Sequence, residues 1–254
     1  MTKTNIATQS KAMIYSKMNY SLNEQKILLI LIAQIDTKST EIKPITITLK
    51  DMSEFYGKKI VSRELKRTLD KLNSHFWLKI DNKHIQTSMF SEIIVEDGSS
   101  DITFIFSKRV EEHLINFKPG IRFVQTNIKN IVPLSNKYSV RIYQLLKLHL
   151  WDKEVRKELF NIELEELQTI FMTPKSYNND FNLFNTKVLK PALEEINKKT
   201  DLNFSYETHK TGRKVTTITF DMSTDMLKSS RIKHNQNEKY NLNIKFNKTV
   251  YTNI

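Results

Sequence analysis

The helices and strands expected in this chain follow one order twice, and this repetition limits the fold more than any other feature. Ser21 and Glu24 form a capping-box pattern, in which each side chain caps a backbone N–H of the other residue. This pattern predicts the start of a helix over residues 22–35. An alternating segment at residues 42–49 predicts a strand. The first copy therefore begins with a helix and then a strand.

Two further helices and a set of strands complete this first copy. Thr48 and Asp51 form a second capping box and predict a short helix that ends near Gly57. A longer helix is expected over residues 58–75. Strand-like runs follow at residues 76–80, 84–95 and 101–106, and a turn at residues 97–98 predicts a hairpin between the last two.

The same order returns after residue 130. Expected in turn are a helix over 135–150, a strand over 158–162, a short helix over 163–172, a long helix over 180–200, and a hairpin of residues 202–208 and 214–222 about Gly212. The letters agree as well, since ITLKDMSEF at 47–55 aligns with IELEELQTI at 162–170. Helix, strand, helix, helix and hairpin is the order of a winged helix-turn-helix domain. The expected fold is α+β, with two tandem winged helix-turn-helix domains in a pseudo-two-fold relation.

The chain is expected to divide into three segments. Residues 1–124 form the first winged-helix domain and residues 125–222 the second, with the join near residues 123–133. Residues 223–254 are polar, basic and rich in asparagine, with little periodicity, so a disordered tail is expected there.

Composition points to a polyanionic partner. The 254 residues carry 40 Lys and Arg against 28 Asp and Glu, a net charge of +12, and the excess occurs in both halves. Nucleic acid or an anionic membrane surface would attract such a chain. The absence of cysteine excludes disulfides and thiolate metal sites. The apolar run at 27–35 is too short to span a bilayer, and the N-terminus lacks a signal-peptide core, so a cytoplasmic protein is expected.

Enzyme signatures are scarce, and no catalytic residue, metal or cofactor is expected. The four glycines are isolated and the six histidines are scattered without metal-ligand spacing. Tyr143 and Lys147 match the pattern of nucleases that nick DNA through a tyrosine ester, which leaves a rolling-circle nickase as an alternative. Tyr143 also lies on one helical stripe with Val140, Leu146 and Leu150, which favours a role in the core.

The predicted helix 58–75 has the pattern of a DNA-reading helix. Val61, Leu65, Leu69 and Leu72 fall on one face, and basic side chains fall on the other. The second helix of a helix-turn-helix enters the major groove, where arginine reads guanine and lysine contacts phosphate. An ordinary solvated face is the alternative. The DNA-binding residues expected here are Lys58, Lys59, Ser62, Arg63, Lys66 and Arg67.

In the second copy, the long helix is less basic than helix 58–75, and the hairpin has a basic tip. Its long helix carries Pro191, which predicts a kink. The residues expected to contact DNA on this helix and its preceding turn are Lys175, Asn179, Asn182, Thr186, Lys187 and Lys190. The hairpin tip would lie along the phosphate backbone, where cations gain from counterion release, through Lys210, Gly212, Arg213 and Lys214.

Several of these stretches, taken in order, resemble the iteron-binding plasmid replication initiators, the Rep proteins with two winged-helix domains. The resemblance covers residues 19–222. It is carried by SLNEQKIL at 21–28, YSVRIYQLLK at 138–147, VLKPALEEIN at 188–197, TDLNF at 200–204 and GRKVTTITF at 212–220. One departure concerns Asn185 and Thr186, because the family often has basic residues after the phenylalanine matched by Phe184.

The resemblance implies a non-enzymatic, plasmid-encoded bacterial initiator. Monomers would bind direct repeats in double-stranded origin DNA, promote melting, and recruit the host initiator and replicative helicase. Homodimers, joined through the first domain and in equilibrium with monomers, would bind an inverted repeat and repress the initiator's own promoter. A winged-helix transcriptional repressor without origin function stays open. An RNA-binding or membrane-surface protein would explain the charge but not the duplicated unit.

Overall fold

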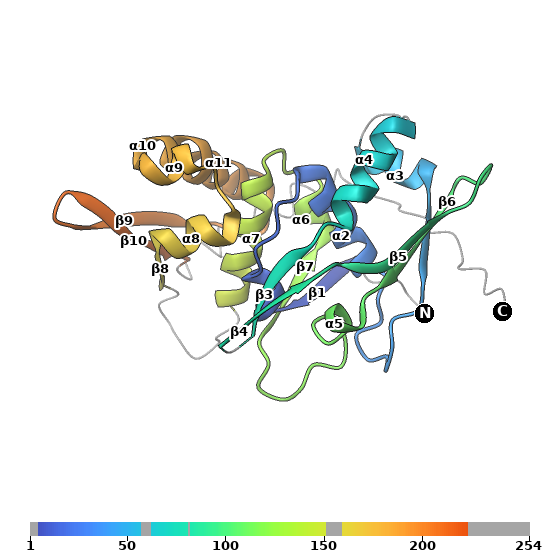
Figure 1. The fold of residues 1–254 in the computed structure, drawn as a ribbon. Coiled ribbons are helices and arrows are strands. Elements are labelled where there is room, and N and C mark those ends of the chain that lie inside the picture. The colour runs from blue at the N-terminus through green and yellow to red at the C-terminus, as the bar shows by residue number, and fades with distance from the viewer. Residues whose placement is uncertain (1–4, 57–61, 81, 151–158, 223–254) are drawn as a thin grey trace.

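In a computed structural model, the chain forms two α+β units that pack around a central helix (Figure 1). The structure describes residues 5–56, 62–80, 82–150 and 159–222. The expected tail at 223–254 lies outside these residues. Within the described residues, no helix is long and apolar enough to cross a membrane.

The first part of the chain contains more elements than the sequence pattern indicates. It comprises β1 (Ile6–Ser10), α1 (Lys11–Ile14), α2 (Leu22–Ile32), β2 (Ile45–Thr48), α3 (Leu49–Tyr56), α4 (Ser62–Leu72), β3 (Phe76–Ile80), β4 (Lys83–Thr87), β5 (Phe90–Val95), β6 (Asp101–Phe106), α5 (Lys108–Glu111), β7 (Phe123–Asn127) and α6 (Ile128–Ile131).

The central helix α7 (Lys137–His149) leads into the second part. There the order is β8 (Leu159–Glu163), α8 (Leu164–Phe171), α9 (Lys175–Asn179), α10 (Phe181–Phe184), a π-helical turn η1 (Asn185–Leu189), α11 (Lys190–Lys199), β9 (Ser205–Thr211) and β10 (Lys214–Asp221).

The sheet topology confirms the duplication. In the first part, β2 pairs antiparallel with β6, which pairs with β5. In the second part, β8 pairs antiparallel with β10, which pairs with β9. In both sheets the strand before the helix-turn-helix thus joins the last strand of the following hairpin, so that the hairpin is anchored beside the helices. Two small sheets, β3–β4 and β1–β7, occur only in the first part of the described chain.

Both predicted capping boxes are present. The Ser21 N–H donates to Glu24 Oε2 at 2.6 Å, and the Ser21 side chain accepts from the Glu24 N–H, at the start of α2. The Thr48 N–H donates to Asp51 Oδ2 at 2.9 Å, and the Asp51 N–H donates back to Thr48 Oγ1 at 3.0 Å, at the start of α3. Side-chain caps replace the missing backbone partners of a first turn, so these helix starts are set locally.

Three details of the sequence prediction are wrong. Helix α2 ends at Ile32 rather than at residue 35. The run 84–95 is two strands in different sheets, β4 and β5. Residues 175–179, expected as a turn, form the helix α9. The long helix is interrupted by the π-helical turn η1, which ends two residues before Pro191. A proline inside a helix removes a backbone N–H donor and crowds the preceding turn, so a change of backbone pairing at this place agrees with the predicted effect of Pro191.

Helix α7 is buried along most of its length and bonds to segments far away in the sequence. Arg141 is 8% exposed, and its guanidinium donates to the carbonyls of Ile14 at 2.8 Å and Ser16 at 2.9 Å. Burial lowers the pKa of Arg141 to about 10, so it remains charged at neutral pH. Gln144 Nε2 donates to Gln9 Oε1 at 2.7 Å. The N-terminal segment is therefore fastened to α7 by buried polar contacts.

The start of α7 is held by a carboxylate from α11. Glu195 accepts hydrogen bonds from the backbone N–H groups of Ser135 at 2.6 Å and Asn136 at 3.2 Å, and pairs with Lys199 at 2.8 Å. Burial would raise the pKa of Glu195, but these donors outweigh it and lower the pKa to about 2. On the other side of this segment, Lys26 of α2 donates to the Val132 carbonyl at 2.7 Å. Side chains from both parts of the chain thus bond to the same connection, residues 132–136.

We expect Glu195→Gln to lower the free energy of unfolding by about 1–3 kcal/mol at pH 7, because it removes a buried anion from several donors. The folded-state pKa lies below the ordinary value of 4.5, so the stabilisation is complete above about pH 4.5 and lost as pH falls toward 2. The difference in free energy of unfolding between parent and variant, measured by urea denaturation, should therefore decrease as the pH falls from 4.5 toward 2. Glu194→Gln, on the exposed side of α11, is the control and should change little. A constant difference down to pH 2 would contradict this account.

Candidate nucleic-acid interface

The exposed face of α4 is basic, as the sequence predicts. Arg63, Lys66 and Arg67 are exposed, while Leu65 and Leu69 are partly buried and Leu72 is fully buried. None of the three cations has an ion pair within the described part of the chain. Ser62 is the first residue of α4, and Lys58 and Lys59 lie outside the described residues.

The corresponding helix of the second part is the run α10–η1–α11. Phe184, Val188, Ala192 and Ile196 are fully buried and form the apolar face of this run. The polar side chains expected to meet DNA lie at exposed positions, namely Asn182, Thr186, Lys187 and Lys190 on this run and Lys175 and Asn179 on α9.

The two residues that depart from the family pattern have structural partners. Asn185 Oδ1 accepts a hydrogen bond from the Tyr206 hydroxyl of β9 at 2.5 Å. The Thr186 hydroxyl donates back to the Asn182 carbonyl at 2.7 Å. Asn185 therefore ties the hairpin to the helix. The bond between Tyr206 and Asn185 could not be predicted, because a contact between a strand and the preceding helix leaves no local pattern in the sequence.

The β9–β10 hairpin has an apolar base and a basic tip. Phe204, Ile218 and Phe220 are buried, and Gly212 forms the turn at φ 61°. The left-handed backbone region at that turn suits glycine. The cations at the tip are exposed, namely Lys210, Arg213 and Lys214.

The two basic helices lie along one edge of the molecule. In Figure 1, α4 and the segment α9–α11 both follow the upper edge, and the start of α7 lies between them. The β9–β10 and β5–β6 hairpins project at opposite ends of the same view. The helices that carry the predicted residues of the two copies thus lie along one edge.

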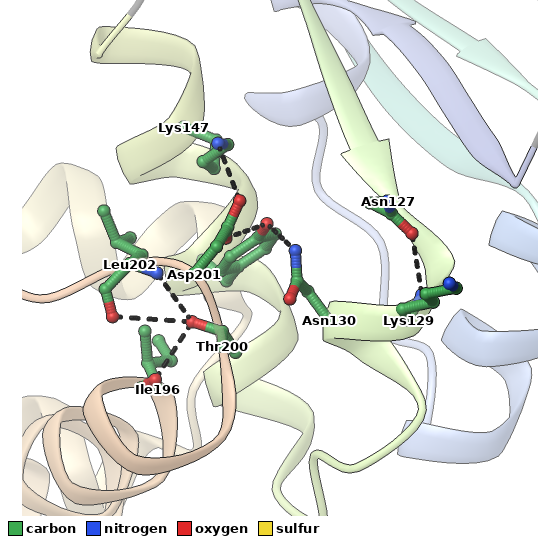
Figure 2. A network of polar contacts seen from close by, with 9 residues as sticks. Asn127, Lys129, Asn130, Lys147, Ile196, Thr200, Asp201 and Leu202 are labelled. Atoms are coloured by element: carbon green, nitrogen blue, oxygen red, sulfur yellow. Dashed lines mark hydrogen bonds and ion pairs between the residues drawn. The ribbon is translucent and has the colours of Figure 1, made fainter. Parts of the chain in front are cut away.

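Tyr143 belongs to the core and not to this edge. Its side chain is fully buried, and its hydroxyl donates to Asp201 Oδ1 at 2.7 Å and accepts from Asn130 Nδ2 at 2.9 Å. Figure 2 shows Asp201 between this network and Lys147, whose Nζ lies 3.3 Å from Asp201 Oδ2. Burial, with the nearby Asp201 carboxylate, raises the pKa of Tyr143. A nucleophilic tyrosine needs the opposite, access and a lowered pKa.

Metal-assisted chemistry has no candidate ligand set in the described ranges, where no three His, Asp or Glu residues gather closely enough to hold an ion.

Comparison with known families agrees with the duplicated fold. The family model described as "Initiator Replication protein, WH1" matches residues 6–147, and the one described as "Initiator Rep protein, WH2" matches residues 163–222. The chain belongs to the replication initiator protein family. The predicted domain boundary after residue 124 stays a prediction.

Individual relatives are more distant. The chain is 30% identical over 128 residues to a "Replication initiation protein" of Escherichia coli, across 50% of this chain and 39% of the relative. It is 27% identical over 165 residues to the "PI protein" of Escherichia coli, across 61% of this chain and 54% of the relative. The chain thus spans less than two thirds of the length of either relative.

A solved structure shares the fold of this initiator. The crystal structure of the Pi initiator protein in complex with iteron DNA has a TM-score of 0.70 at 20% sequence identity, over 87% of this chain and 98% of that chain. At this identity the likeness establishes the fold alone.

We expect Tyr143→Phe to lower the free energy of unfolding by about 1–3 kcal/mol, because Asn130 and Asp201 lose a buried partner. Urea denaturation measures this loss. Tyr177→Phe is the matched control, since the Tyr177 hydroxyl forms no hydrogen bond within the described residues. Supercoiled origin DNA incubated with the parent and Mg²⁺ or Mn²⁺ should stay intact. Nicking that disappears in Tyr143→Phe would instead establish the nickase alternative.

Proposed function

We propose that this initiator binds iteron repeats in double-stranded DNA at a plasmid origin and starts replication there. The observation that carries the proposal is the pair of exposed, basic helices on one edge, each followed by an anchored hairpin. Helices in this position enter successive major grooves, about one helical turn of ~10 bp apart. The fold shared with the iteron-bound Pi initiator supports the same conclusion.

Within this proposal, each part of the chain has a distinct task. The α4 face, with Arg63 foremost, reads base edges, and the second helix contributes fewer base contacts because Asn185 and Thr186 have structural partners. The cations of the β9–β10 tip contact phosphates and position the protein. The basic composition of the chain supports the polyanionic partner.

The proposal extends to the replication cycle in the bacterial cytoplasm. Monomers bind the direct repeats, promote melting of the origin, and recruit the host initiator and replicative helicase. Homodimers, joined through the first domain, bind an inverted repeat and repress the initiator's own promoter. Family membership supports these steps.

The second candidate is a repressor with the same DNA-binding surface but no origin function. Supplying the protein to cells that carry an origin plasmid with evenly spaced direct repeats separates the two. Plasmid maintenance that depends on the protein supports the initiator. Promoter repression without maintenance supports the repressor.

We expect Arg63→Ala to weaken binding to the cognate repeat by about 1–3 kcal/mol and to relax sequence preference there, because a bidentate contact to guanine is lost. Titration of cognate and random duplexes at one salt concentration measures both effects. An equal loss on the two duplexes would show that Arg63 contacts only phosphate.

We expect Lys214→Gln at the wing tip to weaken binding to cognate and random duplexes alike, because a phosphate contact is blind to sequence. The slope of log K against log salt should shrink by about one. Lys118→Gln, in the exposed loop between α5 and β7 at the lower edge of Figure 1, is the control of equal charge. A loss confined to the cognate repeat would contradict this assignment.

A further inference from the structure

A basic groove joins α4 to the start of α7. One depression is lined by residues from the start of α2, by Arg67 and Lys71 of α4, and by residues 135–137 at the start of α7. A second depression runs beside α4 and also includes Arg67 and Lys71, together with Arg63 and Lys66. The two depressions are neighbours, because Arg67 and Lys71 line both, and together they are here called the junction groove.

The charge of the junction groove is strongly unbalanced. Its lining carries Arg63, Lys66, Arg67, Lys71 and Lys137 against the carboxylates of Glu24 and Asp70. Glu24 is already engaged, since it accepts the Ser21 N–H at 2.6 Å in the capping box. In the described ranges, none of the five cations has an ion pair. The groove therefore presents more positive charge than its two carboxylates can neutralise.

Lys137 is held at the domain junction rather than on a free surface. It is half-buried at the first position of α7, and its Nζ lies 4.9 Å from the centre of the Tyr138 ring. Burial lowers the pKa of its amino group, and Glu24 opposes that effect. An anion in the groove would stabilise the charged amino group, which burial disfavours. The connection just before it is fixed by Glu195.

We propose that the junction groove binds the DNA phosphate backbone between the two major-groove segments, with Lys71 and Lys137 as phosphate contacts from the two sides of the junction. The inference rests on the proposed function and adds a site that extends from α4 to the start of α7, away from both hairpin tips. A duplex that receives α4 in one major groove and α10–α11 in the next must pass the start of α7, which lies between them (Figure 1).

The lining favours phosphate over an acidic protein segment. Leu22 is the one apolar side chain among the lining residues of the two depressions, and the others are charged, amide or hydroxyl groups. Protein interfaces bury an apolar centre, whereas contacts to phosphate come from Lys, Arg, Asn and Ser side chains. The groove is also continuous with the α4 face that faces DNA in the proposed function.

The site has a mechanical consequence for recognition. One wall belongs to α4 and the other to the start of α7, which α11 holds through Glu195. A phosphate strand bound to both walls would fix the distance between the two reading helices. Lys71 and Lys137 would then set the register between the two major-groove contacts without reading any base.

The test uses Lys71→Gln, Lys137→Gln and the double variant in the full chain, with Lys118→Gln as the control of equal charge. Binding to a direct-repeat duplex and to a random duplex is titrated over a series of salt concentrations. Each groove variant should lose about eightfold in affinity at 0.1 M salt on both duplexes, and its salt slope should shrink by about 0.9. A duplex with neutral methylphosphonate linkages between the two major-groove segments should bind the parent more weakly, by about the same factor as the substitutions. The affinity of the double variant should be the same for this duplex as for the unmodified one.

The outcomes separate this site from the function on which it rests. If both groove variants keep the parent's slope of log K against log salt while Arg63→Ala still binds the cognate repeat more weakly, the phosphate site in the groove is wrong. The proposed function would then still stand. Absence of any preference of the parent for direct repeats would overturn the function itself. Unchanged DNA binding with loss of plasmid maintenance would assign the groove to a protein partner and overturn the proposal. Lys71 is exposed on α4, so its variant carries the test if Lys137→Gln lowers the melting temperature.

Discussion

The arrangement of both winged-helix units depends on how α7 is held between them. Its middle is fastened by the buried Arg141 guanidinium, which caps carbonyls near the end of α1. Its start is fastened by Glu195 from α11. A buried charge that loses its hydrogen bonds costs free energy, so these contacts favour one position of α7 over others. The spacing between α4 and α10–α11 follows from that position. A protein proposed to read two successive major grooves needs this spacing to be constant.

The parts of the fold that could be predicted from sequence are those with local causes. The capping boxes at Ser21 and Thr48 use residues three apart, and both are present. The Gly212 turn and the apolar stripe through Phe184 and Val188 also follow from short-range patterns. The parts that were missed have distant causes. Strand β1 pairs with β7, which lies far along the chain, and neither segment alternates clearly enough to predict that pairing.

The candidate site divides in the same way. The cations of α4 and of the β9–β10 tip were predictable, because helical and strand periodicity place them on exposed faces. Lys71 and Lys137 were not, since they come from separate helices and meet only through tertiary packing. For Asn185, the sequence argued against a DNA contact. A departure from the family pattern reduced the expectation of base contact, and the Tyr206 hydroxyl gives that residue a structural role instead.

In the proposed function, the positive charge of the chain serves two purposes, and only one concerns DNA. Lys26 donates to the Val132 carbonyl, Lys199 to the Pro133 carbonyl and Arg141 to carbonyls near α1, so part of the basic excess satisfies backbone groups at the junction. Such cations are committed to the fold and release no counterions when DNA binds. Net charge therefore overstates the number of phosphate contacts. In the proposed function, the cations without ion pairs in the described residues, along α4, the junction groove and the wing tip, would determine the salt dependence of binding.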